Sequence, residues 1–491
     1  MTIDFNALLN EAAAREKGEK AWDNADPDIT YQGTQITLPG EPGPMPTEKA
    51  IRTLQRKLKD ENTMMEVHEI IEAHPHDALV AFNRAMKEKY GWSSPTPQQG
   101  WFGEISPTLL TVKTGPGPKD SIQVPHGMFT LPGVENPIET KMATINNMPV
   151  LVIQGTVRKR ESAVVKELAQ YARELLAEHS IYKGQAVRLK VNENGDLMIH
   201  EAPIFMKTKH IEEKELILNP EEHSQLRAGL WSVLRNTAAC IKHNIPLNRG
   251  VLLEGPYGTG KTMAATVTSK ICVDNNWTYI LLDDVRALKE ALLFAQRYQP
   301  AVIFAEDADR VSDKRDQRGN DLLNTIDGVL TKDAQVITVL TTNFVERLDP
   351  AMLRPGRLDT VISIRPPEAE AVEKLIRLYA RGTLAEDANL TEVAARLAGN
   401  IPATIREVVE RSKLTMLLED RSTINTDDLT TAAISMERHL ELLAGKKPEP
   451  TKEHQFGAMM IELISPTVHE KVVEGTEEMA GQVERLYNRI M

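Results

Sequence analysis

One eight-residue segment restricts the fold of this chain more than any other, and it reads Gly255-Pro256-Tyr257-Gly258-Thr259-Gly260-Lys261-Thr262. The apolar run VLLE precedes it and the run MAATVTSK follows it, so the pattern is strand, glycine loop, helix. The glycines let successive backbone N–H groups turn inward around phosphate groups, and the helix N-terminus adds partial positive charge. We expect Lys261 to reach the β- and γ-phosphates of a nucleotide and the Thr262 hydroxyl to ligate Mg²⁺, with Met263 completing the binding segment.

The glycine loop lies in a region where helical stretches alternate with short apolar runs. These runs are VLLEG, TYILL, AVIFA, VITVL and VISI, and we expect each to form a strand. Their alternation with helices predicts the α/β fold class, with a mostly parallel sheet flanked by helices. The residues that follow have a wholly helical pattern, which predicts a helical lid.

Composition shifts along the chain predict seven segments, and no internal repeat is present. A mixed α+β N-terminal region, in which VHEIIEAHPH is interpreted as the polar end of a helix, precedes the α/β part. The predicted segments are 1–46, a tail and linker; 47–92, a helical segment; 93–147, a Pro- and Gly-rich β-like region; 148–210, a small α+β domain with a hairpin turn at NENGD; 211–370, the large α/β subdomain; 371–445, the helical lid; and 446–491, a linker and C-terminal helices.

A pair of acids follows the apolar run PAVIFA, at Glu306 and Asp307. A buried strand that delivers carboxylates at its C-terminal end is how P-loop enzymes hold the Mg²⁺ shell and activate water. Further along come LLNTIDGVL, VITVLTTN and LDPAMLRPGRLD.

The ordered series GPYGTGKT, PAVIF with its acids, TTN and LDPAMLRPGRLD closely resembles the AAA family of ATPases, over residues 211–445. The resemblance implies ATP and Mg²⁺ as cofactors and implies that Asn343 helps to orient the attacking water. It also implies that Arg354 and Arg357 reach the nucleotide of a neighbouring subunit, because a guanidinium neutralises charge on the γ-phosphoryl group. Arginines that act across a subunit boundary require a ring, so the family implies a homo-oligomer, most often a hexamer.

The lid segment LAGNIPATIREVVERS is similar to the family's second sensor. Pro402 and Ala403 fall where a Gly-Ala pair usually lies beside the nucleotide, which places Ala403 among the expected binding residues. Arg406, one turn later, either approaches the phosphates or is a solvated helix arginine, and the sequence leaves both open.

The order of the two acids departs from the family pattern, which has Asp first and Glu second. Here Glu306 takes the magnesium-side position and Asp307 the water-activating position. The same order is expected in the branch resembling the mitochondrial Rieske-protein translocase, whose members hydrolyse ATP, and LLNTIDGV also resembles that branch. We therefore expect an active site in which Glu306 and Thr262 face the metal.

A second departure concerns the stretch DDVRALKEALLFAQRYQP between the second strand and the acidic strand. Members that thread polypeptides carry an aromatic-hydrophobic-glycine loop there, whereas this stretch has no glycine and no aromatic residue at its start. The sequence thus favours a ring that moves or assembles a partner without an aromatic grip.

Composition narrows the remaining possibilities. The net charge is −12, which argues against nucleic acid or an anionic membrane as the main partner. With Cys240 and Cys272 as its two cysteines, no secretory leader pattern and no apolar run of about 18 residues, the chain is expected to be cytoplasmic. His68, His74 and His76 lie close together, but their spacing does not match a zinc motif.

These features predict a Mg²⁺-dependent ATPase ring that remodels, unfolds or assembles a protein partner recognised by the N-terminal 210 residues. The alternatives are a nucleic-acid-associated motor or loader, and a scaffold ring that nucleotide stabilises while hydrolysis stays slow.

Overall fold

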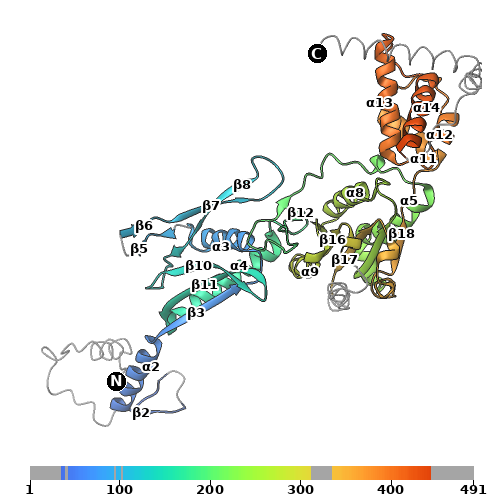
Figure 1. Ribbon diagram of the computed structural model, residues 1–491. Coiled ribbons are helices and arrows are strands. Elements are labelled where there is room, and N and C mark those ends of the chain that lie inside the picture. Colours follow the sequence, from blue (N-terminus) through green and yellow to red (C-terminus); the bar gives the residue numbers. More distant parts are fainter. Residues whose placement is uncertain (1–34, 39–41, 93–94, 101–102, 311–333, 444–491) are drawn as a thin grey trace, which may run out of the picture. The chain divides into compact units, whose positions relative to one another are not determined.

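The computed structural model describes residues 35–38, 42–92, 95–100, 103–310 and 334–443. The chain divides into two compact units, Met1–Pro366 and Pro367–Met491 (Figure 1). The first unit contains a five-stranded sheet near its N-terminus and a seven-stranded sheet after it, and the second unit is helical. Among the described residues, no helix is both long enough and apolar enough to cross a membrane.

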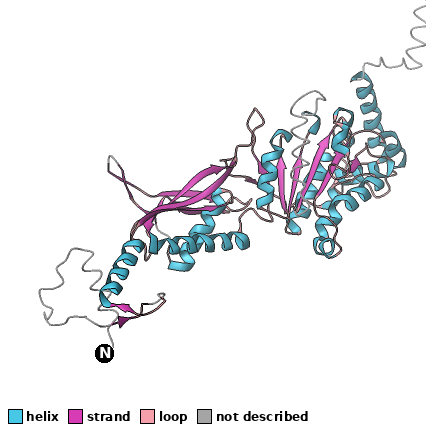
Figure 2. Cartoon of the chain, turned by 90° about the horizontal axis from the view of Figure 1, so that it is seen from below, coloured by secondary structure: helices cyan, strands magenta, loops and turns pink. Residues whose placement is uncertain are grey.

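The larger sheet has the strand order β13-β12-β15-β16-β17-β14-β18, and all its pairings are parallel except that of β12 with β13. All five apolar runs expected to be strands lie in this sheet, which confirms the α/β fold class. The sheet contains two further strands, β12 and the antiparallel edge strand β13. Helices cover both faces of the sheet (Figure 2). Its strands are β12 (Ala186–Leu189), β13 (Ile204–Phe205), β14 (Arg249–Glu254), β15 (Thr278–Leu282), β16 (Ala301–Ala305), β17 (Val336–Thr342) and β18 (Thr360–Ser363), and the helices of this part are α5 (Pro220–Leu226), α6 (Ser232–Arg235), α7 (Thr237–Lys242), α8 (Lys261–Asp274) and α9 (Leu288–Arg297).

The central strands are apolar throughout because alternate residues enter two different cores. Leu252 and Ile303 join the core that contains α9, whereas Val251 and Phe304 join the core that contains α8. Continuous hydrophobic runs are typical of parallel strands buried on both faces. Burial of this kind fixes the strand register, since a slip of one residue would exchange the two cores.

The smaller sheet has the order β3-β11-β10-β9-β4 and is antiparallel throughout. Its two helices pack on one face, with Phe82 of α3 and Leu168 of α4 in the same core as Ile153 of β11 (Figure 2). The elements are α2 (Thr47–Glu61), β3 (Met64–Ile71), α3 (Pro75–Tyr90), β4 (Pro95–Thr96), β9 (Met128–Phe129), β10 (Ile138–Ile145), β11 (Met148–Arg158) and α4 (Ser162–His179), with the two-stranded pairs β1 (Gln35–Ile36) and β2 (Met45–Pro46), β5 (Gln98–Gly100) and β6 (Gly103–Ile105), and β7 (Thr108–Lys113) and β8 (Ser121–His126).

Two expectations about the N-terminal region need correction. Residues 64–71, expected to be helical within 47–92, form strand β3 and pair with β11, so VHEIIEAHPH begins in a strand and not at a helix end. The segment 148–210 is not one separate domain, because β12 and β13 complete the larger sheet. The predicted turn at Asn192–Asp196 is present, with the Asn192 N–H donating to the Asp196 carbonyl oxygen at 2.9 Å.

A buried polar cluster joins the two sheets of the first unit. The backbone N–H of His74, at the start of α3, donates to the Tyr298 hydroxyl at 3.0 Å, and Tyr298 follows α9. The Tyr182 ring contacts His74 and Tyr298 edge-on, with centroids 5.6 and 5.8 Å away. The guanidinium of Arg297 donates to the Pro149 carbonyl oxygen of β11 at 2.8 Å. These contacts connect the N-terminal sheet to the helix that supports β15 and β16.

Two titratable groups of this cluster are buried with shifted pKa values. Burial lowers the pKa of His74 to about 3, with further lowering by the neighbouring His76. Burial raises the pKa of Asp77 to about 6, although the Ser180 hydroxyl and the Ile181 N–H donate to its carboxylate at 2.6 and 2.9 Å. Both residues are almost wholly inaccessible, at 3% and 1% exposure.

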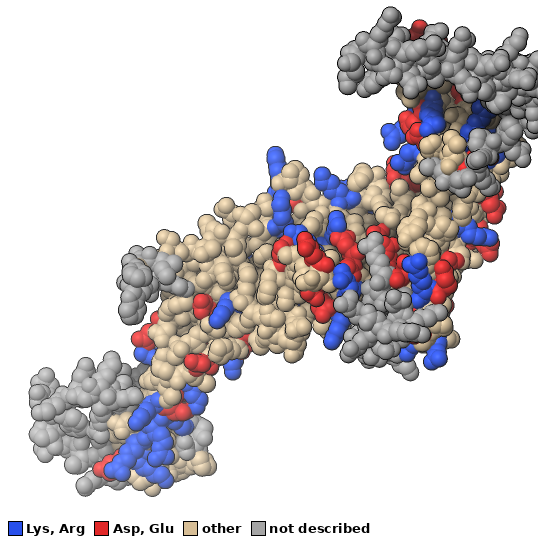
Figure 3. Space-filling model, viewed as in Figure 1, with Lys and Arg blue, Asp and Glu red and all other residues tan. Residues whose placement is uncertain are grey.

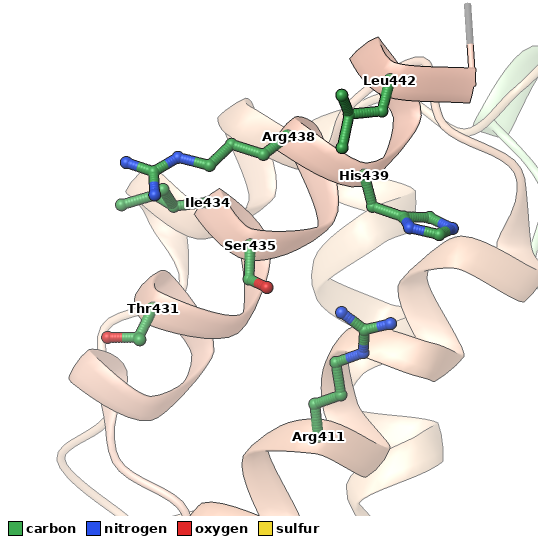
Figure 4. Close-up of a pocket in the computed structure, with 7 residues that line it drawn as sticks. All are labelled: Arg411, Thr431, Ile434, Ser435, Arg438, His439 and Leu442. Carbon is green, nitrogen blue, oxygen red and sulfur yellow. The ribbon is translucent and has the colours of Figure 1, made fainter. Parts of the chain in front are cut away.

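Over its described residues, 367–443, the second unit contains four helices and no sheet, which agrees with the expected helical pattern. They are α11 (Ala369–Ala380), α12 (Thr391–Leu397), α13 (Pro402–Leu418) and α14 (Thr426–Leu443). A groove of about 460 Å³ lies between α13 and α14, lined by Arg411 of α13 and by Arg438 and His439 of α14 (Figure 4). The C-terminal helices expected at 446–491 lie outside the described residues, as does the tail at 1–34.

The two buried groups have opposite effects on stability below pH 7. The pKa of His74 is lower in the folded state than in the unfolded chain, so the unfolded chain binds a proton first as pH falls below 6.5. The free energy of unfolding therefore decreases, by about 2 kcal/mol at pH 5. The pKa of Asp77 is higher in the folded state than in the unfolded chain, so the folded state binds a proton first as pH falls through 6. This increases the free energy of unfolding, by about 1 kcal/mol at pH 5. We predict that Asp77→Asn loses stability between pH 7 and pH 5 relative to wild type, whereas His74→Gln gains it. Denaturant unfolding at the two pH values measures both, and identical pH responses in the two variants would contradict the burial-driven shifts.

Candidate nucleotide site

The expected site residues gather at the carboxyl ends of three neighbouring strands. The glycine loop follows β14, Asn343 follows β17, and Glu306 and Asp307 follow β16. β17 lies between β14 and β16 in the sheet, and the three strands are parallel. Ligands of open α/β sheets bind at this edge, outside the carboxyl ends of the strands.

At Gly255 the glycine loop approaches neighbouring backbone so closely that a side chain does not fit. A Cβ atom on Gly255, whose φ is +149°, would lie 2.1 Å from the Ile364 carbonyl oxygen. Gly260 has φ +118° and precedes the first residue of α8. Beyond Gly255, the loop residues Pro256, Tyr257 and Gly258 are exposed, while Thr259 is buried and its hydroxyl donates to the Pro256 carbonyl oxygen at 2.9 Å. The loop therefore presents backbone to solvent at the N-terminus of a 14-residue helix, which is the arrangement that binds phosphate.

Lys261 is the cation of the loop. Its ammonium group donates to the carbonyl oxygens of Gly255 and Pro256 at 2.5 and 2.8 Å, and the residue is 8% exposed. Burial lowers the pKa of Lys261, and the carboxylates of Asp307 and Asp309 oppose that effect. A partly desolvated ammonium group held near the loop is suited to bind phosphate oxygens. Met263 follows in α8 and packs against the apolar core, so its contribution to binding stays a prediction.

Thr262 and Glu306 meet across the loop, with the Thr262 hydroxyl donating to Glu306 Oε1 at 3.0 Å. Mg²⁺ in such sites is held by one or two protein oxygens together with phosphates and waters. One hydroxyl and one carboxylate at the loop fit that donor set, so these residues would hold Mg²⁺. The ion would supply Lewis-acid stabilisation of charge on the phosphates.

Asp307 has a backbone conformation that is uncommon for residues other than glycine. Its φ is +55°, in the left-handed region, and its N–H donates to the Thr341 hydroxyl at 3.1 Å. Its carboxylate accepts from the Asn343 side-chain amide, also at 3.1 Å. Left-handed geometry at a residue other than glycine costs about 1 kcal/mol or more and concentrates at functional sites. The Asp307 carboxylate is thus paired with Asn343, whereas the Glu306 carboxylate is paired with Thr262. The roles expected for Glu306, Asp307 and Asn343 stay predictions.

Two residues of this edge escaped the sequence reasoning. Asp309 Oδ1 accepts from the Thr342 hydroxyl at 2.8 Å and from the Asn343 N–H at 3.1 Å, so it fixes the end of β17. Thr341 holds the backbone of Asp307, as described above. The third acid in AEDAD was a visible signal for Asp309, but its partners depend on the pairing of β16 with β17, which no local pattern contains.

The arginine loop, which contains Arg354 and Arg357 and precedes β18, packs against β14. The Arg357 guanidinium donates to the Ala351 carbonyl oxygen at 2.7 Å, and Arg354 is exposed to solvent. A Cβ atom on Gly250 would lie 1.9 Å from the Arg357 carbonyl oxygen, so only glycine permits this approach. Action of Arg354 and Arg357 on a neighbouring subunit remains a prediction.

Ala403 lies in the first turn of α13, in the helical unit. Its expected place beside the nucleotide stays a prediction. In the same unit, the Arg406 guanidinium lies over the Tyr379 ring, 4.8 Å from its centroid.

The stretch between β15 and β16 contains a short 3-10 helix, η4 (Val285–Ala287), followed directly by α9. These two helices account for most of the connection. The segment LLNTIDGVL lies within 311–333, outside the described residues. Within the described part of the chain, no three His, Cys, Asp or Glu side chains are grouped to hold a metal ion by themselves, including at His68, His74 and His76.

A glycine loop between a parallel strand and a helix, with a strand-end acid beside its threonine, defines a P-loop nucleoside-triphosphatase. Comparison with known proteins narrows this class. Residues 251–366 match the family described as "ATPase family associated with various cellular activities (AAA)".

Several curated proteins are similar to this chain over about half its length. The ATP-dependent zinc metalloprotease FtsH of Thermus thermophilus is 31% identical, over 44% of this chain and 38% of the relative. The 26S proteasome regulatory subunit 8 homolog of Schizosaccharomyces pombe is 30% identical, over 46% and 58%. The cell division cycle protein 48 homolog of Archaeoglobus fulgidus is 29% identical, over 50% and 34%. The chain therefore spans less than two thirds of the length of each of these relatives, and its matched part is similar to the AAA family of ATPases.

The contact between Gly250 and Arg357 allows a direct test of how the arginine loop is held. We predict that Gly250→Ala forces the loop away from β14, lowers the free energy of unfolding by about 1–3 kcal/mol and reduces ATP turnover. Gly155→Ala is the matched control in a strand of the smaller sheet, because its nearest contact would be the Ile138 methyl group at 3.2 Å. If Gly250→Ala is as stable and as active as Gly155→Ala, the close packing described above is wrong.

Proposed function

We propose that this chain hydrolyses ATP with Mg²⁺ in a homo-oligomeric ring, and that hydrolysis drives the remodelling of a protein partner. The observation that carries the proposal is the left-handed Asp307, whose carboxylate is paired with Asn343 while Glu306 is paired with Thr262. Two adjacent acids with different partners are suited to two different tasks, one at the metal and one at the attacking water.

In this proposal each residue has one task. Lys261 and the loop N–H groups bind the phosphates, and Thr262 with Glu306 binds Mg²⁺. Asp307 accepts a proton from the water, and Asn343 holds the Asp307 carboxylate in place. Arg354 and Arg357 from a neighbouring copy neutralise charge on the γ-phosphoryl group, which makes the ring part of the site.

Asp307→Asn tests the assignment of the two acids. We expect at least a hundredfold loss of kcat with the affinity for ATP kept within about threefold, because a general base contributes to the chemical step. Steady-state ATP hydrolysis and equilibrium binding of a fluorescent ATP analogue measure the two effects. Lys261→Ala serves as the inactive reference, and Asp274→Asn, an exposed residue near the other end of α8, as the matched control. Turnover of Asp307→Asn within twofold of wild type would contradict the proposal.

The N-terminal region offers a surface for the partner on α2. One face of α2 is apolar and packs against β1 and β2 through residues such as Ile51 and Leu54. On the opposite side, basic side chains gather (Figure 3), with a stripe at helical spacing consisting of Lys49, Arg52, Arg56 and Lys59. All four are exposed in a chain of net charge −12. Such a stripe attracts an acidic surface, so we propose that the remodelled protein presents acidic side chains.

Charge reversal on α2 tests the partner surface. In the hydrolysis-slowed Asp307→Asn background, we expect Arg52→Glu with Arg56→Glu to reduce capture of an acidic protein at least tenfold, since like charges then meet. Basal ATP turnover in the otherwise native chain is expected to stay unchanged. Lys207→Glu with Lys209→Glu, also exposed in the first unit, is the charge-matched control. Capture that nuclease treatment abolishes would support the nucleic-acid alternative instead.

A further inference from the structure

An aromatic pair links the phosphate loop to the residue beside Asn343. The Tyr257 ring meets the Phe344 ring edge-on, with centroids 5.8 Å apart and planes at 72°. The Arg347 guanidinium lies over the Phe344 ring, 4.0 Å from its centroid. Phe344 is thus contacted by the phosphate loop and by Arg347, and neither contact belongs to the tasks assigned above.

The exposure of Tyr257 sets this pair apart from ordinary core packing. Tyr257 is 62% exposed and Phe344 is only partly buried. Hydrophobic stabilisation is proportional to the area removed from water, so this contact contributes little to folding through burial. Edge-on aromatic pairs and cation–π contacts have a preferred geometry, and they restrict orientation even where they bury little area.

The backbone of Phe344 continues directly into the catalytic edge. Its N–H donates to the Thr342 hydroxyl at 3.0 Å, and that hydroxyl donates to Asp309. Asn343 lies between Thr342 and Phe344 in the chain, and its own N–H also donates to Asp309. A change in the backbone at Phe344 therefore acts directly on its neighbour Asn343, whose side chain donates to the Asp307 carboxylate.

We propose that Phe344 is a positioning residue, clamped between Tyr257 and Arg347, that couples the conformation of the phosphate loop to the Asn343–Asp307 pair. When the loop moves on binding phosphate, Tyr257 moves with it and the aromatic contact transmits the change to residue 344. This role rests on the hydrolysis proposed above and deepens it, because it links occupancy of the loop to alignment of the group that activates water.

The test separates catalytic alignment from nucleotide binding. Phe344→Ala is expected to lower kcat about tenfold or more while the affinity for a fluorescent ATP analogue changes less than about threefold. Phe344→Leu, which keeps apolar bulk without the ring, is expected to lose kcat as well, whereas Phe344→Tyr recovers most of it. Glu346→Gln, exposed in the same loop, is the matched control with unchanged turnover.

A double-mutant cycle tests the coupling itself. Tyr257→Ala combined with Phe344→Ala is expected to be no slower than the slower single variant, within about threefold, because both remove the same contact. Losses of kcat that multiply would overturn the coupling. Wild-type kcat in Phe344→Ala, or a loss confined to ATP affinity, would overturn the positioning role alone. If the native chain hydrolyses ATP no faster than Lys261→Ala, the proposed function is overturned, and the positioning role of Phe344 is overturned with it.

Discussion

The parallel pairing of β14, β17 and β16 is the constraint on which the site depends. Glu254 pairs with Thr342, and Ala305 pairs with Leu340, so the glycine loop, Asn343 and the two acids emerge at one edge. The buried faces of these strands fix that register, because a one-residue slip would exchange the two apolar cores. The Thr342 hydroxyl donates to Asp309 and the Asn343 side chain donates to Asp307, while the Thr341 hydroxyl accepts from the Asp307 N–H. The two bonds to Asp307 hold its left-handed backbone in place.

Sequence patterns predicted the larger sheet well, since continuous apolar runs and glycine loops are local signals. They failed where the structure depends on distant partners. The hairpin after the AVRL run is present around Asn192–Asp196, but its sequence does not show that β12 also pairs with β15, about ninety residues later. MMEVHEII was assigned to a helical segment, yet its buried positions Val67 and Ile71 complete a sheet with β11. Asp309 and Phe344 were missed for the same reason, because their contacts appear only when strands from different parts of the chain align.

The first unit also connects the site to the N-terminal sheet. His74, Tyr182 and Tyr298 form a buried polar and aromatic contact between α3 and the end of α9. α9 packs on β15 and β16, and β16 ends at Glu306. Packed side chains thus connect the N-terminal sheet to the strand that ends at the acids.

We propose that two subunits share one ATP site at this edge of the sheet. An experimental structure of the Asp307→Asn variant with ATP and Mg²⁺ tests it most directly. We expect a closed ring in which Lys261, Thr262 and Glu306 of one copy contact the phosphates and the metal. Arg354 and Arg357 of the next copy are expected to reach the γ-phosphate. Nucleotide bound in an isolated subunit, or arginines of the neighbouring copy turned away from the phosphate, would contradict it.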